Sequence, residues 1–192
     1  MVAMWRALTC AAALAGANEA AHAEPPNAPS AAREGRHVLS AGYLVYNLNW
    51  PGVEIGCGYR AVESPERRHA LVVGVDVGTY VWPRHDVGVY ALPRVGWRGR
   101  HRVGLEGSLD VRIGYLHAIP ASPSFQVVDG EVERGGGGGY PMWMASPQVG
   151  VGWFFRRAGV APTVHLGAML QHPVFDALVI RFHVSVGLEV RL

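Results

Sequence analysis

The sequence predicts an all-β fold: an eight-stranded antiparallel up-and-down β-barrel that spans a membrane. Three observations lead to this prediction. From residue 37 onward, hydrophobic residues alternate with polar or small ones at a period of two, which is the pattern of β-strands. The 3.6-residue period of an amphipathic helix is absent from the same segments. Charged residues keep to one of the two faces that the alternation defines, and that face is also rich in glycine.

The composition supports a folded chain in an apolar environment. Of the 192 residues, 49% are hydrophobic and only 17% are charged, whereas a soluble domain carries about 25% charged residues. High hydrophobicity with little charge excludes a disordered chain. The formal net charge is +2 and no basic stretch is dense, which argues against binding of nucleic acid. Two cysteines, Cys10 and Cys57, are too few for a disulfide scaffold or a cysteine-based zinc site.

The first 36 residues precede the barrel. Residues 1–23 are expected to be a secretory signal peptide, with Arg6 before an apolar stretch and small residues at Ala21 and Ala23 before the cleavage point. An ordinary amphipathic N-terminal helix is the alternative. Residues 24–36 are rich in proline and alanine and are expected to form a flexible leader. The barrel itself is assigned to residues 37–192.

Eight segments carry the strand pattern, and each is long enough for the about 9–11 tilted residues with which a strand crosses a bilayer. In chain order they are residues 37–47, 53–62, 70–82, 87–97, 102–117, 142–156, 160–171 and 177–192. The third, fifth and last are the clearest, because their odd and even positions separate into an apolar set and a polar or small set. Pro93, Pro147 and Pro162 fall inside strands on the apolar face, where each removes one ladder hydrogen bond.

The phase of the alternation indicates which face meets lipid. The apolar face is nearly free of charge, and the other face carries charges of both signs, as in a barrel with lipid outside and a polar lumen inside. Charges withdrawn from water need partners. We therefore expect a luminal ion-pair network formed by Glu54, Arg60, Asp76, Arg94, Glu106, Asp110, Arg112, Arg181 and Glu189. Alternation alone does not tell which face meets water, so a secreted soluble β-barrel that binds a small ligand stays as an alternative.

The connections differ in length between the two ends of the predicted barrel. The connection at residues 118–141 is the longest, and five consecutive glycines at 135–139 indicate a flexible loop. The connections at residues 63–69, 98–101 and 157–159 are short and rich in arginine. Short turns and long loops lie at opposite ends of membrane barrels. Aromatic residues near strand ends are expected to form girdles at the two interfaces: Trp97, Tyr115, Trp143, Trp153 and Phe155.

The lumen is predicted to be blocked. Eight strands leave an interior just wide enough for side chains to fill. By the phase of the alternation, four aromatic side chains point inward among the arginines: Tyr80, Trp82, Tyr90 and Phe154. A barrel filled in this way is not an open pore.

Over residues 37–192 the chain resembles the small eight-stranded outer-membrane β-barrel proteins of Gram-negative bacteria. Its last strand is similar to the assembly signal of that family, polar-x-Gly-x-x-aromatic-x-aromatic: Ser185 and Gly187 fit, whereas Val190 and Leu192 are aliphatic. Residues 114–135 followed by 147–153 resemble a group of such barrels without an assigned activity. The resemblance implies location in the cell outer membrane, contact with its lipid and lipopolysaccharide, insertion by the barrel-assembly machinery, and a monomer without cofactor. It implies a structural or surface-binding role through the extracellular loops.

His183 and Ser185 are weak candidates for catalysis. Their spacing resembles that of outer-membrane lipid A deacylases, which use a His and a Ser two residues apart on one strand face. Here both residues are predicted to face the lumen, whereas the site of that family opens toward lipid, and the only carboxylate further along the chain is Glu189. A structural or surface-binding role is therefore preferred to catalysis, and a lipid-modifying outer-membrane enzyme stays as the alternative function.

No other group of residues has the spacing of a catalytic or metal site. His85, His117 and His172 lie near the long-loop end with Asp86 and Asp176, without a recognisable metal-ligand signature, so exposed histidines are expected there. The glycine run at 135–139 lacks the lysine and hydroxyl residue of a phosphate-binding loop. Glu106, Asp110 and Arg112 share one strand face and could act as acid and base only in an accessible pocket, so ion pairs are expected instead.

Overall fold

The computed structural model describes residues 35–192, apart from positions 48, 67, 123–124, 129–130, 135–137 and 175–176. The expected signal peptide and all but the last two residues of the expected leader lie outside this part of the chain. Among the residues it describes, no helix is long and apolar enough to cross a membrane.

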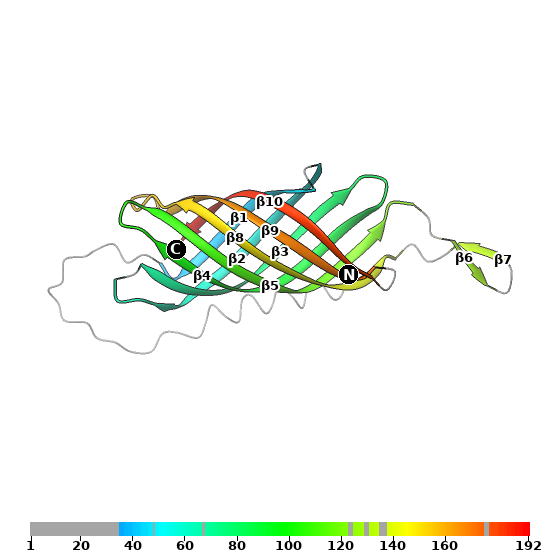
Figure 1. The fold of residues 1–192 in the computed structure, drawn as a ribbon, viewed down its shortest axis with the longest axis horizontal. Helices are drawn as coiled ribbons and strands as arrows, with labels where there is room; N and C mark the ends of the chain where they lie inside the picture. Colours follow the sequence, from blue (N-terminus) through cyan, green and yellow to red (C-terminus); the bar gives the residue numbers. More distant parts are fainter. Residues whose placement is uncertain are drawn as a thin grey trace. The chain divides into compact units, whose positions relative to one another are not determined.

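Eight long strands close into one antiparallel barrel, in the order β1-β10-β9-β8-β5-β4-β3-β2 (Figure 1). The strands are β1 His37–Tyr46, β2 Trp50–Glu63, β3 His69–Trp82, β4 Asp86–Arg100, β5 Leu105–Pro120, β8 Tyr140–Trp153, β9 Val160–Val174 and β10 Ala177–Arg191. Each long strand pairs with the next one along the chain, and β1 pairs with β10 from Val38↔Arg191 to Tyr46↔His183. The predicted eight-stranded antiparallel barrel is confirmed.

The two ends of the barrel differ in their connections. The end that carries residues 64–68, 101–104 and 154–159, together with the start of β1 and the end of β10, is called the terminal end. The end that carries residues 47–49, 83–85, 121–139 and 175–176 is called the loop end. Three of the four loop-end connections are very short, so the segment between β5 and β8 is the main addition to the barrel at that end.

The side chains are distributed inside out. Leu105, Phe182 and Leu188 are exposed on the outer surface of the barrel, with Phe182 the most exposed at 68%. Asp110 and Arg181, on the same strands but the opposite face, retain only 0% and 4% exposure because they point into the lumen. Strand propensity alone allows either orientation of a sheet. An apolar outer surface of this extent is unsuited to water and is the pattern of a transmembrane barrel, which removes the support for a soluble barrel.

Several predicted strand ends differ from the structure by three residues, and two turns at the terminal end show the reason. Residues 102–104 belong to the turn between β4 and β5, where Gly104 has a φ of +99° and its N–H donates to the carbonyl of His101 at 3.0 Å. β4 therefore continues to Arg100. Likewise β8 ends at Trp153, and Phe154 turns its ring into the lumen. The alternation continues through both turns in the sequence, so it could not mark where the chain reverses.

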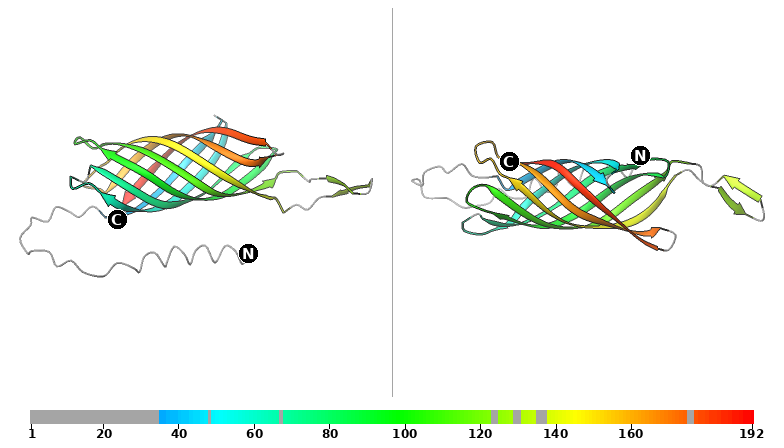
Figure 2. Two further views of the ribbon diagram at one scale, coloured as in Figure 1. Left: turned by 60° about the horizontal axis from the view of Figure 1, so that its bottom comes forward. Right: turned by 45° about the horizontal axis from the view of Figure 1, so that its top comes forward.

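The long connection contains a hairpin that the sequence analysis did not predict. β6 (Phe125–Val128) and β7 (Glu131–Arg134) pair antiparallel from Phe125↔Arg134 to Val128↔Glu131, as a two-stranded sheet separate from the barrel sheet (Figures 1 and 2). In the sequence the two strands are separated by Asp129 and Gly130. An Asp-Gly pair between segments that contain valine is a strong signal for a β-hairpin. The sequence analysis followed the nearby glycine run instead, which indicates a flexible loop.

The three strand prolines are accommodated on the outer surface. The β4–β5 ladder passes from Ala91↔Tyr115 to Arg94↔Arg112 without a pair at Pro93, although Pro93 still pairs with Val75 of β3. The β8–β9 ladder has a corresponding gap at Pro147. Proline lacks the N–H group that a ladder needs, so each gap lies on one side of the strand only. On its other side each proline-containing strand stays paired with its second neighbour in the closed sheet, so these segments remain part of the barrel.

Glycines on the inner face make room for tyrosine rings on the neighbouring strand. Gly78 of β3 is the register partner of Tyr90 of β4, and Tyr80 is the partner of Gly88. A Cβ atom on Gly78 would lie 2.5 Å from Cζ of Tyr90, and one on Gly88 would overlap the ring of Tyr80. Each tyrosine therefore lies across the strand next to it, and the two Gly–Tyr pairs fill the narrow lumen without backbone distortion.

Replacing Gly78 by alanine tests this packing. We expect Gly78→Ala to destabilise the barrel by about 1–3 kcal/mol, because the new methyl group displaces the Tyr90 ring in a closely packed interior. Urea unfolding of the barrel refolded in phospholipid vesicles measures the change. Gly107→Ala is the matched control, because a Cβ there meets nothing within 4 Å. Equal stability of the two variants would contradict the packing described here.

Candidate functional site

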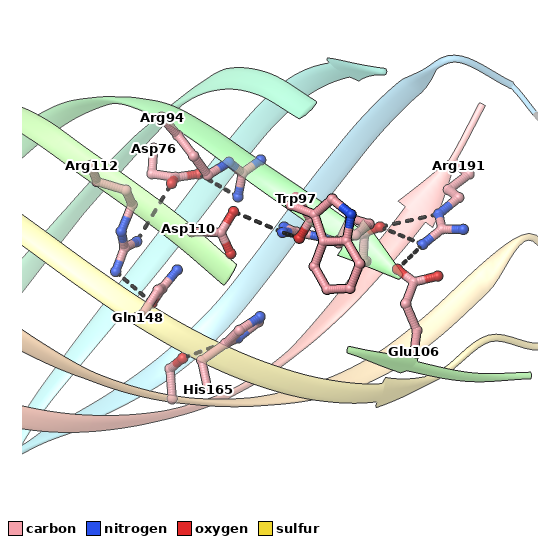
Figure 3. Close-up of polar contacts among 12 residues, drawn as sticks. Asp76, Arg94, Trp97, Glu106, Asp110, Arg112, Gln148, His165 and Arg191 are labelled. Atoms are coloured by element: carbon pink, nitrogen blue, oxygen red, sulfur yellow. Dashed lines mark hydrogen bonds and ion pairs between the residues drawn. The ribbon is translucent and has the colours of Figure 1, made fainter. Parts of the chain in front are cut away.

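The middle of the lumen is built around the guanidinium of Arg112, which is fully buried on β5. Its Nη1 donates to Oε2 of Glu54 at 2.6 Å and lies 3.4 Å from Oδ2 of Asp76. Its Nη2 donates to Oε1 of Gln148 at 2.7 Å (Figure 3). Arg94 completes this central cluster, with Nη1 3.2 Å from Oδ1 of Asp76. The cluster joins β2, β3, β4, β5 and β8 across the lumen, so Arg112 braces strands that are not neighbours in the sheet.

A second cluster fills the terminal end of the lumen. Arg98 lies 2.7 Å from Asp110 and 3.6 Å from Glu189. Arg191 pairs with Glu189 at 3.0 Å and with Glu106. These contacts connect the last strand, β10, to β4 and β5 on the other side of the barrel.

An aromatic ring from a turn closes the terminal cluster. Phe154 is buried next to two guanidinium groups, with Arg100 at 4.0 Å and Arg191 at 4.3 Å from its ring centroid. Nε of Arg100 also lies 3.0 Å from Oε2 of Glu106. Cations close to an aromatic ring gain cation–π attraction that is strongest when water is excluded. The turn after β8 thereby plugs the lumen from the terminal end.

The nine residues of the predicted network all face the lumen, although they do not form one network. Seven of them belong to the central and terminal clusters: Glu54, Asp76, Arg94, Glu106, Asp110, Arg112 and Glu189. Arg60 pairs instead with Glu63 on its own strand, at 3.0 Å. Arg181 lies over the ring of Trp82, 4.4 Å from the centroid, and near Tyr80. Arg98 and Arg100 were missed, because the expected end of β4 placed them in a turn.

The half of the lumen near the loop end has an apolar core beside a few buried polar side chains. The buried side chains of this core are Leu44, Tyr46, Tyr80, Tyr90, Leu92, Leu116, Ala118, Met142, Met144 and Met169, with Trp50 and Trp82 packed against them. We call this set the apolar plug. Tyr90 joins it to the central cluster, since its hydroxyl donates to Oε2 of Glu54 at 2.8 Å. Arg181, Asp86 and Gln171 are also buried toward the loop end, so polar groups occur along the whole lumen and the apolar side chains are concentrated in one half.

His183 and Ser185 both face the lumen and do not form a catalytic arrangement. Ser185 Oγ lies 3.5 Å from Nδ1 of His165 on β9, and His183 is 2% exposed and packs against Tyr46. Glu189 is held by Arg191 and Arg98. A dyad that acts on lipid must open toward the membrane, and these side chains point away from it. The lipid-modifying alternative gains no support from this site.

The histidines near the loop end are engaged with aromatic rings. His85 stacks on Trp82 at 4.1 Å, His172 stacks on Trp143 at 5.8 Å, and His117 accepts or donates a hydrogen bond with Tyr115 at 3.0 Å. Asp86 is buried, and Asp176 lies outside the described residues. Within the part of the chain that is described, no group of three or more His, Cys, Asp or Glu residues is placed to hold a metal ion.

Exposed aromatic residues lie toward both ends of the outer surface. Tyr115, Trp143 and His172 are register partners across β5, β8 and β9, in the loop-end half of these strands. Trp97 and Trp153 are exposed toward the terminal end, where Phe155 follows β8. Amphipathic rings at these two levels suit the interfaces of a membrane with water.

Solved structures with a similar fold are known. The chain is similar to the N-terminal β-barrel domain of OprF from Pseudomonas aeruginosa, with 14% identity and a TM-score of 0.53 over 83% of this chain and 100% of that domain. It is also similar to the outer membrane enzyme PagL, with 13% identity and a TM-score of 0.50 over 81% of this chain and 99% of that one. The fold is that of an eight-stranded outer-membrane barrel. No protein-family model and no curated protein matches the sequence.

Removing the central guanidinium tests the role of the luminal ion pairs. We expect Arg112→Met to destabilise the barrel by about 3–5 kcal/mol, because Glu54 loses its arginine partner inside the lumen and Asp76 keeps only Arg94. Urea unfolding in vesicles measures the loss. Arg84→Gln, in an exposed turn at the loop end, serves as the control and should change stability by no more than about 0.5 kcal/mol. A loss below about 1 kcal/mol for Arg112→Met would show that the cluster does not support the barrel.

Proposed function

We propose that this protein is an integral outer-membrane β-barrel with a closed lumen and a structural or surface-binding role. The observation that carries the proposal is the inverted distribution of side chains: large apolar residues cover the outside, and ion pairs and an apolar plug fill the inside. A barrel needs such a surface only where hydrocarbon surrounds it. The likeness in fold to two outer-membrane barrels supports the choice of membrane.

The partners that follow are those of an inserted barrel. Its outer face contacts outer-membrane lipid and lipopolysaccharide, and it needs the barrel-assembly machinery to insert. The assembly signal is the last strand, with Ser185, Gly187, Val190 and Leu192. This strand makes the final closure with β1, where backbone hydrogen bonds join Leu192 to His37 in both directions at 3.0 and 3.3 Å. Because the sheet closes on itself within one chain, the barrel is complete as a monomer.

Surface binding is assigned to the connection between β5 and β8. The connections at residues 47–49, 83–85 and 175–176 are too short to form a binding surface of their own. The segment at residues 121–139 is much longer and contains its own β6–β7 sheet. Function in this class is concentrated in the loops that a rigid barrel carries, so any specificity of this protein belongs to that segment.

Heat-modifiable mobility in gel electrophoresis tests the membrane assignment. Protein from isolated outer membranes should migrate faster before boiling than after, because a closed barrel resists detergent until it is heated. The control is a sample unfolded in urea, which should migrate at the boiled position in both cases. Recovery of the protein from the periplasmic fraction without a mobility shift would contradict the proposal.

Planar-bilayer recording tests the closed lumen. We expect no discrete current steps from the refolded barrel at neutral pH, because the apolar plug, Arg112 and Phe154 block successive levels of the interior. A porin recorded in the same bilayers is the positive control. Reproducible single-channel steps from this protein would show that the lumen conducts, and the closed-barrel role would then be wrong.

A further inference from the structure

The terminal end of the barrel carries a ring of arginines on its outer rim. Arg36 precedes β1, Arg68 precedes β3, Arg102 lies in the turn after β4, and Arg156 and Arg157 lie in the turn after β8. Four of them are exposed, and Arg68 is half-buried, with 38% of its side chain exposed. We call these five residues the terminal rim. They are separate from the luminal arginines, which point inward and are buried.

The barrel holds the segments of the terminal rim in place. Arg36 is tied to β2, since its carbonyl accepts from the N–H of Arg60 at 2.9 Å. The carbonyl of Arg68 accepts from the N–H of Arg100 at the end of β4, at 2.7 Å. The turn that holds Arg102 is tied to the next turn, because Phe154 donates to the carbonyl of Gly104 at 2.8 Å. The charges are therefore carried by anchored segments at one end of the barrel.

The positive charge of the terminal rim is largely uncompensated. Glu66 pairs with Arg68 at 3.1 Å and is itself 68% exposed. The other carboxylates toward this end, Glu63, Glu106 and Glu189, are engaged with luminal arginines. Among the described residues, no carboxylate forms an ion pair with Arg102, Arg156 or Arg157. Such a cluster attracts anions at its surface.

The loop end has the opposite balance in the sequence. Its connections contain four carboxylates, Asp129, Glu131, Glu133 and Asp176, against two arginines, Arg84 and Arg134. The excess of arginine is thus confined to one end of the barrel. If these charges served only solubility, positive and negative residues would be mixed at both ends of the barrel. The excess of arginine at one end therefore indicates an anionic partner there.

The position of the terminal rim identifies that partner. Phe155 comes directly before Arg156, and Trp153 and Trp97 are exposed on the outer surface toward the same end. Aromatic side chains of this kind mark the depth of the lipid headgroups. Guanidinium groups next to them lie at phosphate level, and arginine binds phosphate oxygens through paired N–H donors. We propose that the terminal rim binds the headgroups of anionic phospholipids in the leaflet at the terminal end, an inference that rests on the proposed membrane insertion.

Electron spin resonance with spin-labelled lipids tests the inference. The full barrel is reconstituted in phosphatidylcholine membranes, and the motionally restricted fraction is compared for labelled phosphatidylglycerol and labelled phosphatidylcholine. We expect a several-fold preference of the wild type for phosphatidylglycerol, which 0.5 M salt reduces because the headgroup charges are screened. The triple variant Arg102→Gln/Arg156→Gln/Arg157→Gln should lose most of the preference. The corresponding triple lysine variant should keep most of it, and Arg84→Gln at the loop end should leave it unchanged.

Heat-modifiable mobility of every variant in the same membranes shows whether the barrel is inserted. A barrel that does not insert overturns the proposed function together with this inference. An inserted barrel with equal preference in the wild type and the glutamine variant overturns the inference alone. Cosedimentation with isolated peptidoglycan that depends on the same three arginines, without a lipid preference, would assign the terminal rim to the cell wall and would also overturn it.

Discussion

The whole molecule depends on the cost of placing a charge against hydrocarbon. A strand that crosses a bilayer shows one face to lipid, and a charged side chain at the middle of that face is strongly unfavourable. Carboxylates and guanidinium groups within the membrane must therefore turn inward. Inside a barrel this narrow, the charges have little water and must find each other. The pairing of Arg112 with Glu54 and Asp76, and of Arg98 with Asp110, is the direct consequence of that constraint.

Paired charges alone would not fill the lumen, and packing supplies the rest. The Gly78–Tyr90 and Tyr80–Gly88 pairs show how the interior is divided: where one strand has no side chain, the next strand lays a ring across it. Gly96 serves Asp110 in the same way, since a Cβ there would displace the carboxylate. Glycine on the inner face therefore positions large neighbours, which explains why the charged face is also the glycine-rich one.

The contents of the lumen and the rims give the barrel a direction. Toward the loop end the interior is an apolar plug, and toward the terminal end it consists of ion pairs closed by Phe154. Outside, exposed arginines gather at the terminal end, and the longest connection with its own small sheet lies at the loop end. A structural role for the middle of the barrel and contact roles for its two ends are consistent with this division.

The sequence by itself determined the eight strands, the antiparallel order and the face of each residue, because a period of two is a local property that any strand must show. It also predicted that the charges would lie inside, and the exposed Phe182 and buried Asp110 of the folded barrel decided this against a soluble barrel. Only the tertiary structure decided which charges pair, since Arg112 and Glu54 come from β5 and β2 and meet across the lumen. The ends of β4 and β8, the position of Arg181 over the ring of Trp82 and the apolar core near the loop end were also decided there. Alternation records which face a side chain is on, but the depth at which it lies and what it meets depend on register and turns that join distant strands.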